Sequence, residues 1–221
     1  YSCWFSWAIA KAVEGFLKPS SEEKHLESLP RNEATALVAT ISLVAAEEYP
    51  FVIQPMIRIL RRAYTSTYIP RSQVNRAFLL MHGLCTGSHI PYEKWNDVND
   101  EVLSFLCGQL INGLANDQEC NSLFSDNEDQ QAMFWEEMIL YSQVLGDVVD
   151  LQEKTHQGVN SNILALLRES CLALETLETL NKDNGVLHYQ KVLALEVVGS
   201  CLRAGNKLLL PAADTKEQNK L

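Results

Sequence analysis

Apolar residues recur every three or four positions along most of this chain, the spacing that places them on one face of an α-helix. The first such run starts near Trp4 and stops at Pro19. A second run covers residues 33–48, which Asn32 can cap, with Leu37 and Ile41 on its apolar face. The pattern thus predicts helices over both segments.

A tight turn at Tyr49-Pro50 is predicted to lead into another helix. Pro55 would lie in its first turn, where proline is tolerated. Its apolar residues Met56 and Leu60 would face inward. Later runs predict helices that begin after Pro70, near Asp97 or Asn99, at Glu128, after Asn160 and at Leu187.

The sequence therefore predicts eight or nine helices joined by short loops, with no convincing strand. We predict an all-α fold, either an α-solenoid built from helical hairpins or an irregular helical bundle. Residues 1–210 would form one helical domain and residues 211–221 a flexible polar tail. Because Tyr1 opens directly onto an apolar helical run, we expect the chain to be a fragment of a longer protein.

Residues 33–63 combine an apolar helix, a proline turn and a second helix with inward aliphatic and outward arginine side chains. This unit resembles a HEAT or armadillo repeat, and helix pairs continue at a spacing of roughly 40 residues. The resemblance is at the level of the class, and no repeated motif marks the later pairs. It implies a solenoid that binds other proteins along a curved surface and is not an enzyme.

Charge is sorted along the chain, whose net charge is −10. Residues 49–92 hold five arginines, no lysine and no carboxylate, whereas residues 95–153 hold thirteen carboxylates and no cation. Such asymmetry bears on partners and association, not on the fold. The acidic total argues against non-specific binding of nucleic acid by the whole chain.

The arginine-rich stretch is the leading candidate for a binding site. Arginine is suited to carboxylate and phosphate groups, and tyrosine adds flat contact surface. We expect the stretch to bind an acidic protein partner. A nucleic-acid backbone with a stacked base is a second possibility, and internal pairing with the acidic stretch is a third. The candidate residues are Arg58, Arg61, Arg62, Tyr64, Tyr68, Arg71 and Arg76.

Three tryptophans are further candidates for contact with a partner. Phe134 and Trp135 are adjacent in a predicted helix, so their side chains point about 100° apart. At least one should face away from the core, and we expect Trp135 to be an exposed interface residue. Trp4 and Trp7 are expected to pack on a missing part of the chain or on a partner.

The strongest enzymatic pattern is His82-Gly83 followed by Gly83-Leu84-Cys85-Thr86-Gly87. It is similar to the oxyanion segment and nucleophile elbow of α/β-hydrolases, which would make Cys85 or His82 catalytic. Those functions need a strand, however, and helical spacing precedes this string. The trio His82, Cys85 and His89 lacks the second ligand pair of a zinc site, so no metal and no cofactor are expected.

Six scattered cysteines without a Cys-x-x-Cys pair, and the absence of an Asn-x-Ser/Thr acceptor, favour a reducing compartment, the nucleus or cytoplasm. The longest weakly polar run, 34–46, is shorter than the roughly 20 residues needed to span a bilayer. The sequence therefore predicts a non-catalytic scaffold or adaptor subunit of a larger intracellular complex.

Overall fold

The computed structural model describes residues 2–18, 29–65, 68–87, 100–115, 128–153, 161–179 and 185–209, and every regular element within these ranges is helical. The predicted all-α class is therefore confirmed. The elements are α1 (Ser2–Phe16), α2 (Arg31–Ile41), the short 3₁₀ helix η1 (Ala46–Glu48), α3 (Tyr49–Tyr64), α4 (Arg71–Gly87), α5 (Asp100–Ala115), α7 (Glu128–Glu153), α8 (Ser161–Thr179) and α9 (Gly185–Leu209).

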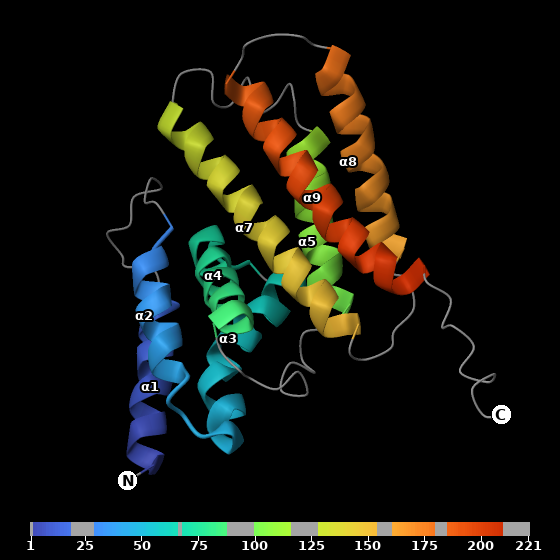
Figure 1. Cartoon of the computed structure of the whole chain (residues 1–221). Helices are drawn as coiled ribbons and strands as arrows, with labels where there is room; N and C mark the ends of the chain where they lie inside the picture. Colours follow the sequence, from blue (N-terminus) through green and yellow to red (C-terminus); the bar gives the residue numbers. More distant parts are fainter. Residues whose placement is uncertain are drawn as a thin grey trace, which may run out of the picture.

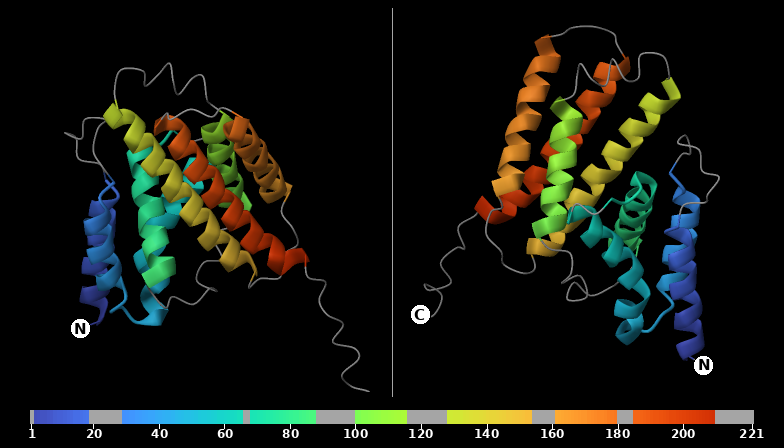
Figure 2. Two further views of the ribbon diagram at one scale, coloured as in Figure 1. Left: turned by 45° about the horizontal axis from the view of Figure 1, so that its top comes forward. Right: turned by 180° about the vertical axis from the view of Figure 1, so that it is seen from behind.

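The helices pair into four successive hairpins, α1/α2, α3/α4, α5/α7 and α8/α9 (Figure 1). Each helix also packs against its counterpart in the next hairpin, which produces two layers. One layer runs α1, α3, α5, α8, and can be followed from behind in Figure 2. The other runs α2, α4, α7, α9. Stacked hairpins of this kind form an α-solenoid, the first of the two predicted architectures.

The boundaries between successive hairpins differ from those that the sequence suggested. α2 packs against α1 and α4 and not appreciably against α3, so residues 33–63 are not one repeat. They join the second helix of one hairpin to the first helix of the next. The hairpins begin at Ser2, Tyr49, Asp100 and Ser161, so their spacing increases along the chain and exceeds the expected 40 residues.

The helix predicted over residues 33–48 ends earlier than expected, at Ile41, and Pro30, not Asn32, occupies its N-cap position. At its end the Thr40 hydroxyl donates to the Ala36 carbonyl and the Ser42 hydroxyl to the Ala39 carbonyl. Such side-chain bonds offer the backbone an alternative to helical pairing. The segment after Ser42 can therefore cross from one layer to the other.

The proline assignment in α3 also needs correction. Tyr49 and Pro50 belong to the helix, with Pro50 in its first turn, and the buried Pro55 lies inside it. Proline inside a helix leaves the carbonyl four residues earlier without its donor. That residue is Phe51, which is 54% exposed, so water can reach its carbonyl.

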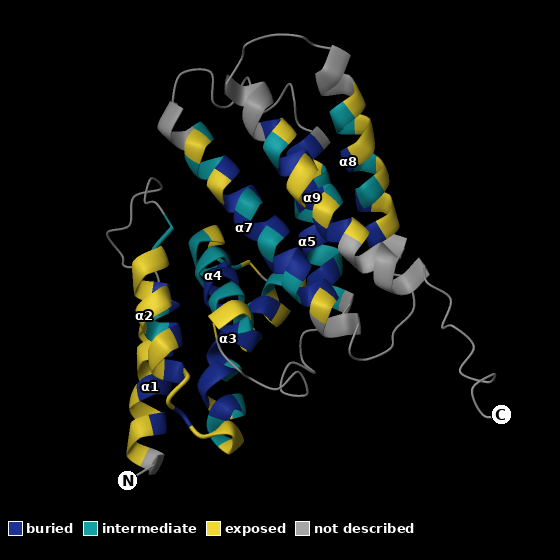
Figure 3. Ribbon diagram, in the orientation of Figure 1, coloured by how far each residue is buried: buried dark blue, intermediate teal, exposed yellow. Residues whose placement is uncertain are grey.

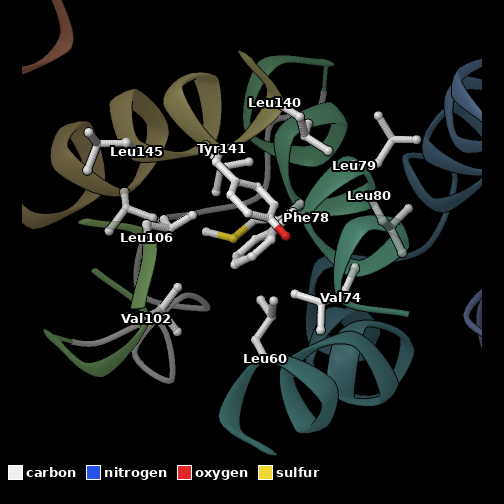
Figure 4. Close-up of a cluster of buried hydrophobic side chains, with 14 of the residues drawn as sticks. Leu60, Val74, Phe78, Leu79, Leu80, Val102, Leu106, Leu140, Tyr141 and Leu145 are labelled. Carbon is white, nitrogen blue, oxygen red and sulfur yellow. The ribbon is translucent and has the colours of Figure 1, made fainter. Parts of the chain in front are cut away.

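The core runs through both layers, and burial alternates with exposure along each helix at helical spacing (Figure 3). The apolar residues that recur at helical spacing after Pro70 predict the inward face of α4, and the prediction is confirmed, since Val74, Ala77, Phe78, Met81 and Leu84 are all buried. Phe78 lies at the centre of the junction between α3, α4, α5 and α7 (Figure 4). Its ring contacts the ring of Tyr141 edge to face at 5.2 Å and stacks with that of Phe105 at 6.0 Å. Aromatic pairs at these separations add stability beyond buried area.

No described helix is long and apolar enough to cross a membrane. Several predicted features lie outside the described residues: the helix starts at Asp97 or Asn99 and at Asn160, and the tail 211–221.

Candidate partner-binding site

Three arginines of α3 remain on the surface as predicted. Arg58, Arg61 and Arg62 are all exposed, at the i, i+3, i+4 spacing that places them on one side of the helix. We call these three residues the α3 arginine face. The Arg58 Nε donates to the Gln54 carbonyl at 3.4 Å, a bond within the helix. Neither Arg58 nor Arg62 forms an ion pair with a described residue.

Arg71 at the start of α4 is instead paired with the acidic stretch. Its Nε donates to the Glu137 carboxylate of α7, and its guanidinium lies 5.8 Å from the centre of the Phe134 ring. Burial disfavours the charge of Arg71, but the Glu137 carboxylate outweighs this effect and raises the pKa of Arg71. The side chain is nevertheless 56% exposed. Internal pairing, one of the predicted alternatives, therefore holds for Arg71.

Tyr141 completes the polar group around Glu137. Its hydroxyl lies 2.9 Å from a Glu137 carboxylate oxygen and 2.8 Å from the Asn75 side-chain amide. A phenol has one proton, so it donates to only one of them. The carboxylate is the stronger acceptor, and an Asn75 amide turned by 180° would donate to the phenol oxygen. Burial raises the pKa of Tyr141 well above its usual value, and the Glu137 charge adds to this effect.

Arg76 is largely withdrawn from the surface, with 12% of its side chain exposed, and is not part of the α3 arginine face. Its guanidinium donates to the Phe16 carbonyl at 3.1 Å, lies 5.3 Å from the centre of the Phe16 ring, and is 3.9 Å from Glu33. Phe16 is the last residue of α1, so its carbonyl has no partner within the helix. Arg76 thus caps α1 and joins the first hairpin to the second.

The aromatic residues predicted to contact a partner also differ in their exposure. Tyr64, the last residue of α3, is 36% exposed, and Tyr68, which follows the helix, is 92% exposed. The expectation of an exposed Trp135 is wrong, because this side chain is 1% exposed. α7 packs against α4, α5 and α9 together, so helices surround it on more than one side. Two adjacent residues can therefore both face protein.

Further exposed aromatic and basic residues lie on α1 and α3. Trp4 and Trp7 of α1 are 76% and 49% exposed and contact each other edge to face, with ring centres 5.9 Å apart. Lys11 of the same helix is exposed, and α1 packs directly against α3. On α3, Phe51 is also exposed, and it precedes Arg58 by two turns. Sequence reasoning missed Phe51, although its position relative to Arg58 would have revealed it.

A cleft opens next to the arginine face, at the junction of α3, α4, α5 and α7. Its volume is about 160 Å³. Tyr141 and Arg71 bring the polar group described above to its wall. The lining residues are Ala63, Ile69, Arg71, Val74, Phe105, Gln109 and Tyr141.

The local structure at His82 and Cys85 differs from the strand and sharp turn of an α/β-hydrolase nucleophile elbow. His82 and Cys85 lie within α4, which is continuous from Arg71 to Gly87, so no strand delivers them into a sharp turn. The His82 Nδ1 lies 2.9 Å from an Asp147 carboxylate oxygen of α7, a second polar link between α4 and α7. Among the described residues, no three His, Cys, Asp or Glu side chains form a group that could hold a metal ion.

No protein-family model, no curated protein and no solved structure significantly matches this chain. Its class is therefore defined by its own structure, a two-layer α-solenoid of helical hairpins with exposed arginines on α3 and exposed aromatic residues on α1 and α3.

Proposed function

We propose that this chain is a non-catalytic scaffold or adaptor that binds an acidic segment of a protein partner at the α3 arginine face. The observation that carries the proposal is the exposure of Arg58, Arg61 and Arg62 on a helix that contains no carboxylate. Arginine forks bind carboxylates with two parallel hydrogen bonds. Tyr68 and Phe51 would add apolar contact area next to these charges, as at many protein interfaces.

The choice of a protein over a nucleic acid rests on the remaining charge. The chain carries a net charge of −10, and thirteen carboxylates lie between residues 95 and 153. A long polyanion that followed the solenoid beyond α3 would meet this negative region and be repelled. A short acidic segment restricted to α1 and α3 would not. We also propose that the protein acts in a reducing compartment, the nucleus or cytoplasm, where free thiols such as those of Cys107, Cys171 and Cys201 are usual.

The test compares three forms of the chain as bait in extracts of the source cells, with quantitative mass spectrometry of bound proteins. They are the unaltered chain, the double variant Arg58→Glu/Arg62→Glu, and the control Arg168→Glu. Arg168 is exposed on α8, so its reversal changes charge at a distant place. Circular dichroism and thermal unfolding confirm that each form folds.

We expect a partner that the double variant loses and the Arg168→Glu variant retains, and whose binding weakens with salt. Equal capture by all three folded forms would contradict the proposal. Capture that nuclease treatment abolishes would show that the arginine face binds nucleic acid instead.

A further inference from the structure

We propose that the cleft between α3, α4, α5 and α7 receives one apolar side chain of the same acidic segment. The recognised motif would then be a cluster of Asp or Glu residues next to a single aromatic or large aliphatic anchor. This inference rests on the proposed function, since it specifies the partner of the α3 arginine face.

The size and lining of the cleft fit one side chain. Its volume is about 160 Å³, similar to the roughly 150 Å³ cavity that holds a benzene molecule in an engineered protein. About half of its wall is apolar, from Ala63, Ile69, Val74 and Phe105, and the rest comes from Arg71, Gln109 and Tyr141. Phe105 offers a ring against which an aromatic anchor can pack.

The polar groups of the wall also favour an apolar occupant. The Tyr141 hydroxyl already lies within hydrogen-bond distance of Glu137 and Asn75, and the Glu137 carboxylate is bonded to Arg71. These buried groups therefore need no partner from a ligand. An apolar anchor leaves this network intact, whereas a buried charged anchor would have to lose its hydration.

The cleft adjoins the cationic surface on two sides. Ala63 lies on the cleft wall directly after Arg62 in α3. At 100° per residue, Arg62 is nearer to the cleft around the helix than Arg61, which lies about 160° from Ala63. Arg71 forms part of the opposite wall, and more than half of its side chain is exposed. A segment anchored in the cleft can thus place carboxylates beside Arg62 and Arg71.

Selection of short random peptides displayed on phage, with the full chain immobilised, tests the motif directly. We expect enrichment of peptides that combine acidic residues with one apolar residue at a fixed spacing. Acidic peptides without a shared apolar position would overturn the anchor but leave the proposed function standing. Enrichment without acidic residues, or no enrichment, would contradict both.

Variants that fill the cleft locate the anchor. Ala63→Phe from α3 and Gln109→Phe from α5 occupy the same space from two sides, and Ala165→Phe is the control at an exposed alanine of α8. We expect either filling variant to weaken the selected peptide roughly tenfold or more, the scale of one buried apolar side chain. The control should bind unchanged.

A double-mutant cycle decides whether the anchor enters the cleft. Replacing the anchor of the peptide by alanine should weaken its binding to the unaltered chain by a similar factor. The same replacement should cause little further loss of affinity for the Ala63→Phe variant. If the two changes reduce the affinity by independent factors that multiply in the double mutant, the inference is wrong. Arg62→Glu should reduce affinity more than Arg61→Glu, and the reverse order would contradict the proposed position of the segment.

Discussion

Arg71 of α4 and Glu137 of α7 form an ion pair in which the Glu137 side chain is almost fully buried and the Arg71 side chain is more than half exposed. The residues are 66 positions apart and belong to consecutive hairpins. The pair joins the basic stretch of the sequence to the acidic one. One arginine of the basic stretch is thus paired with the acidic stretch within the fold, whereas the arginines of α3 remain exposed.

Removing the cation should destabilise the junction of α4 and α7. Arg71→Met leaves the buried Glu137 carboxylate without its strongest partner, and we expect the free energy of unfolding to fall by about 1–3 kcal/mol. Urea denaturation at neutral pH measures this change. The exposure of Arg71 keeps the expected loss below that of a fully buried pair.

The matched variant separates lost charge pairing from lost packing. In Arg71→Met/Glu137→Gln the buried group is a neutral amide that Tyr141 can still contact, so part of the stability should return. A double variant no more stable than Arg71→Met would show that the carboxylate is not the source of the loss.

Periodicity in the sequence was sufficient to predict α4 and its buried face, because Val74, Phe78 and Met81 recur at helical spacing. It could not predict the surroundings of Trp135, which depend on how many helices pack around α7. Likewise the position of Arg58, Arg71 and Arg76 in one arginine-rich stretch of the sequence suggested one binding site. Only the tertiary arrangement brings Arg76 to the Phe16 carbonyl at the end of α1 and Arg71 to Glu137.

The close approach of α2 and α4 depends on Gly83. A Cβ at this position would lie 2.8 Å from the Val38 Cγ2 of α2, and valine has few rotamers with which to yield. We expect Gly83→Ala to lower the free energy of unfolding by about 1–3 kcal/mol, the usual cost of overpacking, despite the higher helix propensity of alanine. Thermal unfolding measures the change.

The same substitution at Gly199 of α9 should have the opposite sign. A Cβ there meets nothing within 4 Å, so Gly199→Ala should stabilise the chain by about 0.5–1 kcal/mol through helix propensity. Val38→Ala should also restore part of the stability lost in Gly83→Ala. If Gly83→Ala and Gly199→Ala shift the melting temperature alike, the close packing of α2 on α4 is wrong.

Arg76 is expected to act as a structural cap and not as a partner contact. Arg76→Ala removes the donor from the Phe16 carbonyl and the cation from its ring. The end of α1 should then open more readily, with amide exchange in residues 5–16 about tenfold faster, corresponding to roughly 1–2 kcal/mol. Hydrogen exchange with mass spectrometry follows this segment.

Arg62→Ala is the control for Arg76, since it removes an exposed arginine of α3 and should leave the exchange of α1 unchanged. Arg76→Lys keeps the charge but loses the planar fork, so it should fall between the two. Protection of α1 that is the same in all three variants would contradict the capping role.

The stability of the fold should decline in mild alkali because of two buried thiols. Burial raises the pKa of Cys107 to about 12, with Cys201 adding to the effect, and burial raises that of Cys201 to about 12, with Cys171 adding. An unfolded thiol ionises near pH 8.5–9. The folded chain therefore holds these protons more tightly than the unfolded chain. The contribution of the protonated thiols to the free energy of unfolding is fully present below about pH 9 and is lost as the pH rises toward 12. Each thiol should lower the free energy of unfolding by up to about 1.4 kcal/mol per pH unit above pH 9.

Urea denaturation between about pH 8 and pH 10, under reducing conditions, measures this slope before Tyr141, whose unfolded pKa is near 10, contributes with the same sign. The control is Cys107→Ala/Cys201→Ala. It should be less stable at pH 8 because two buried side chains are truncated, yet its stability should change less with pH. An equally steep decline in the control would show that other groups cause the alkaline loss.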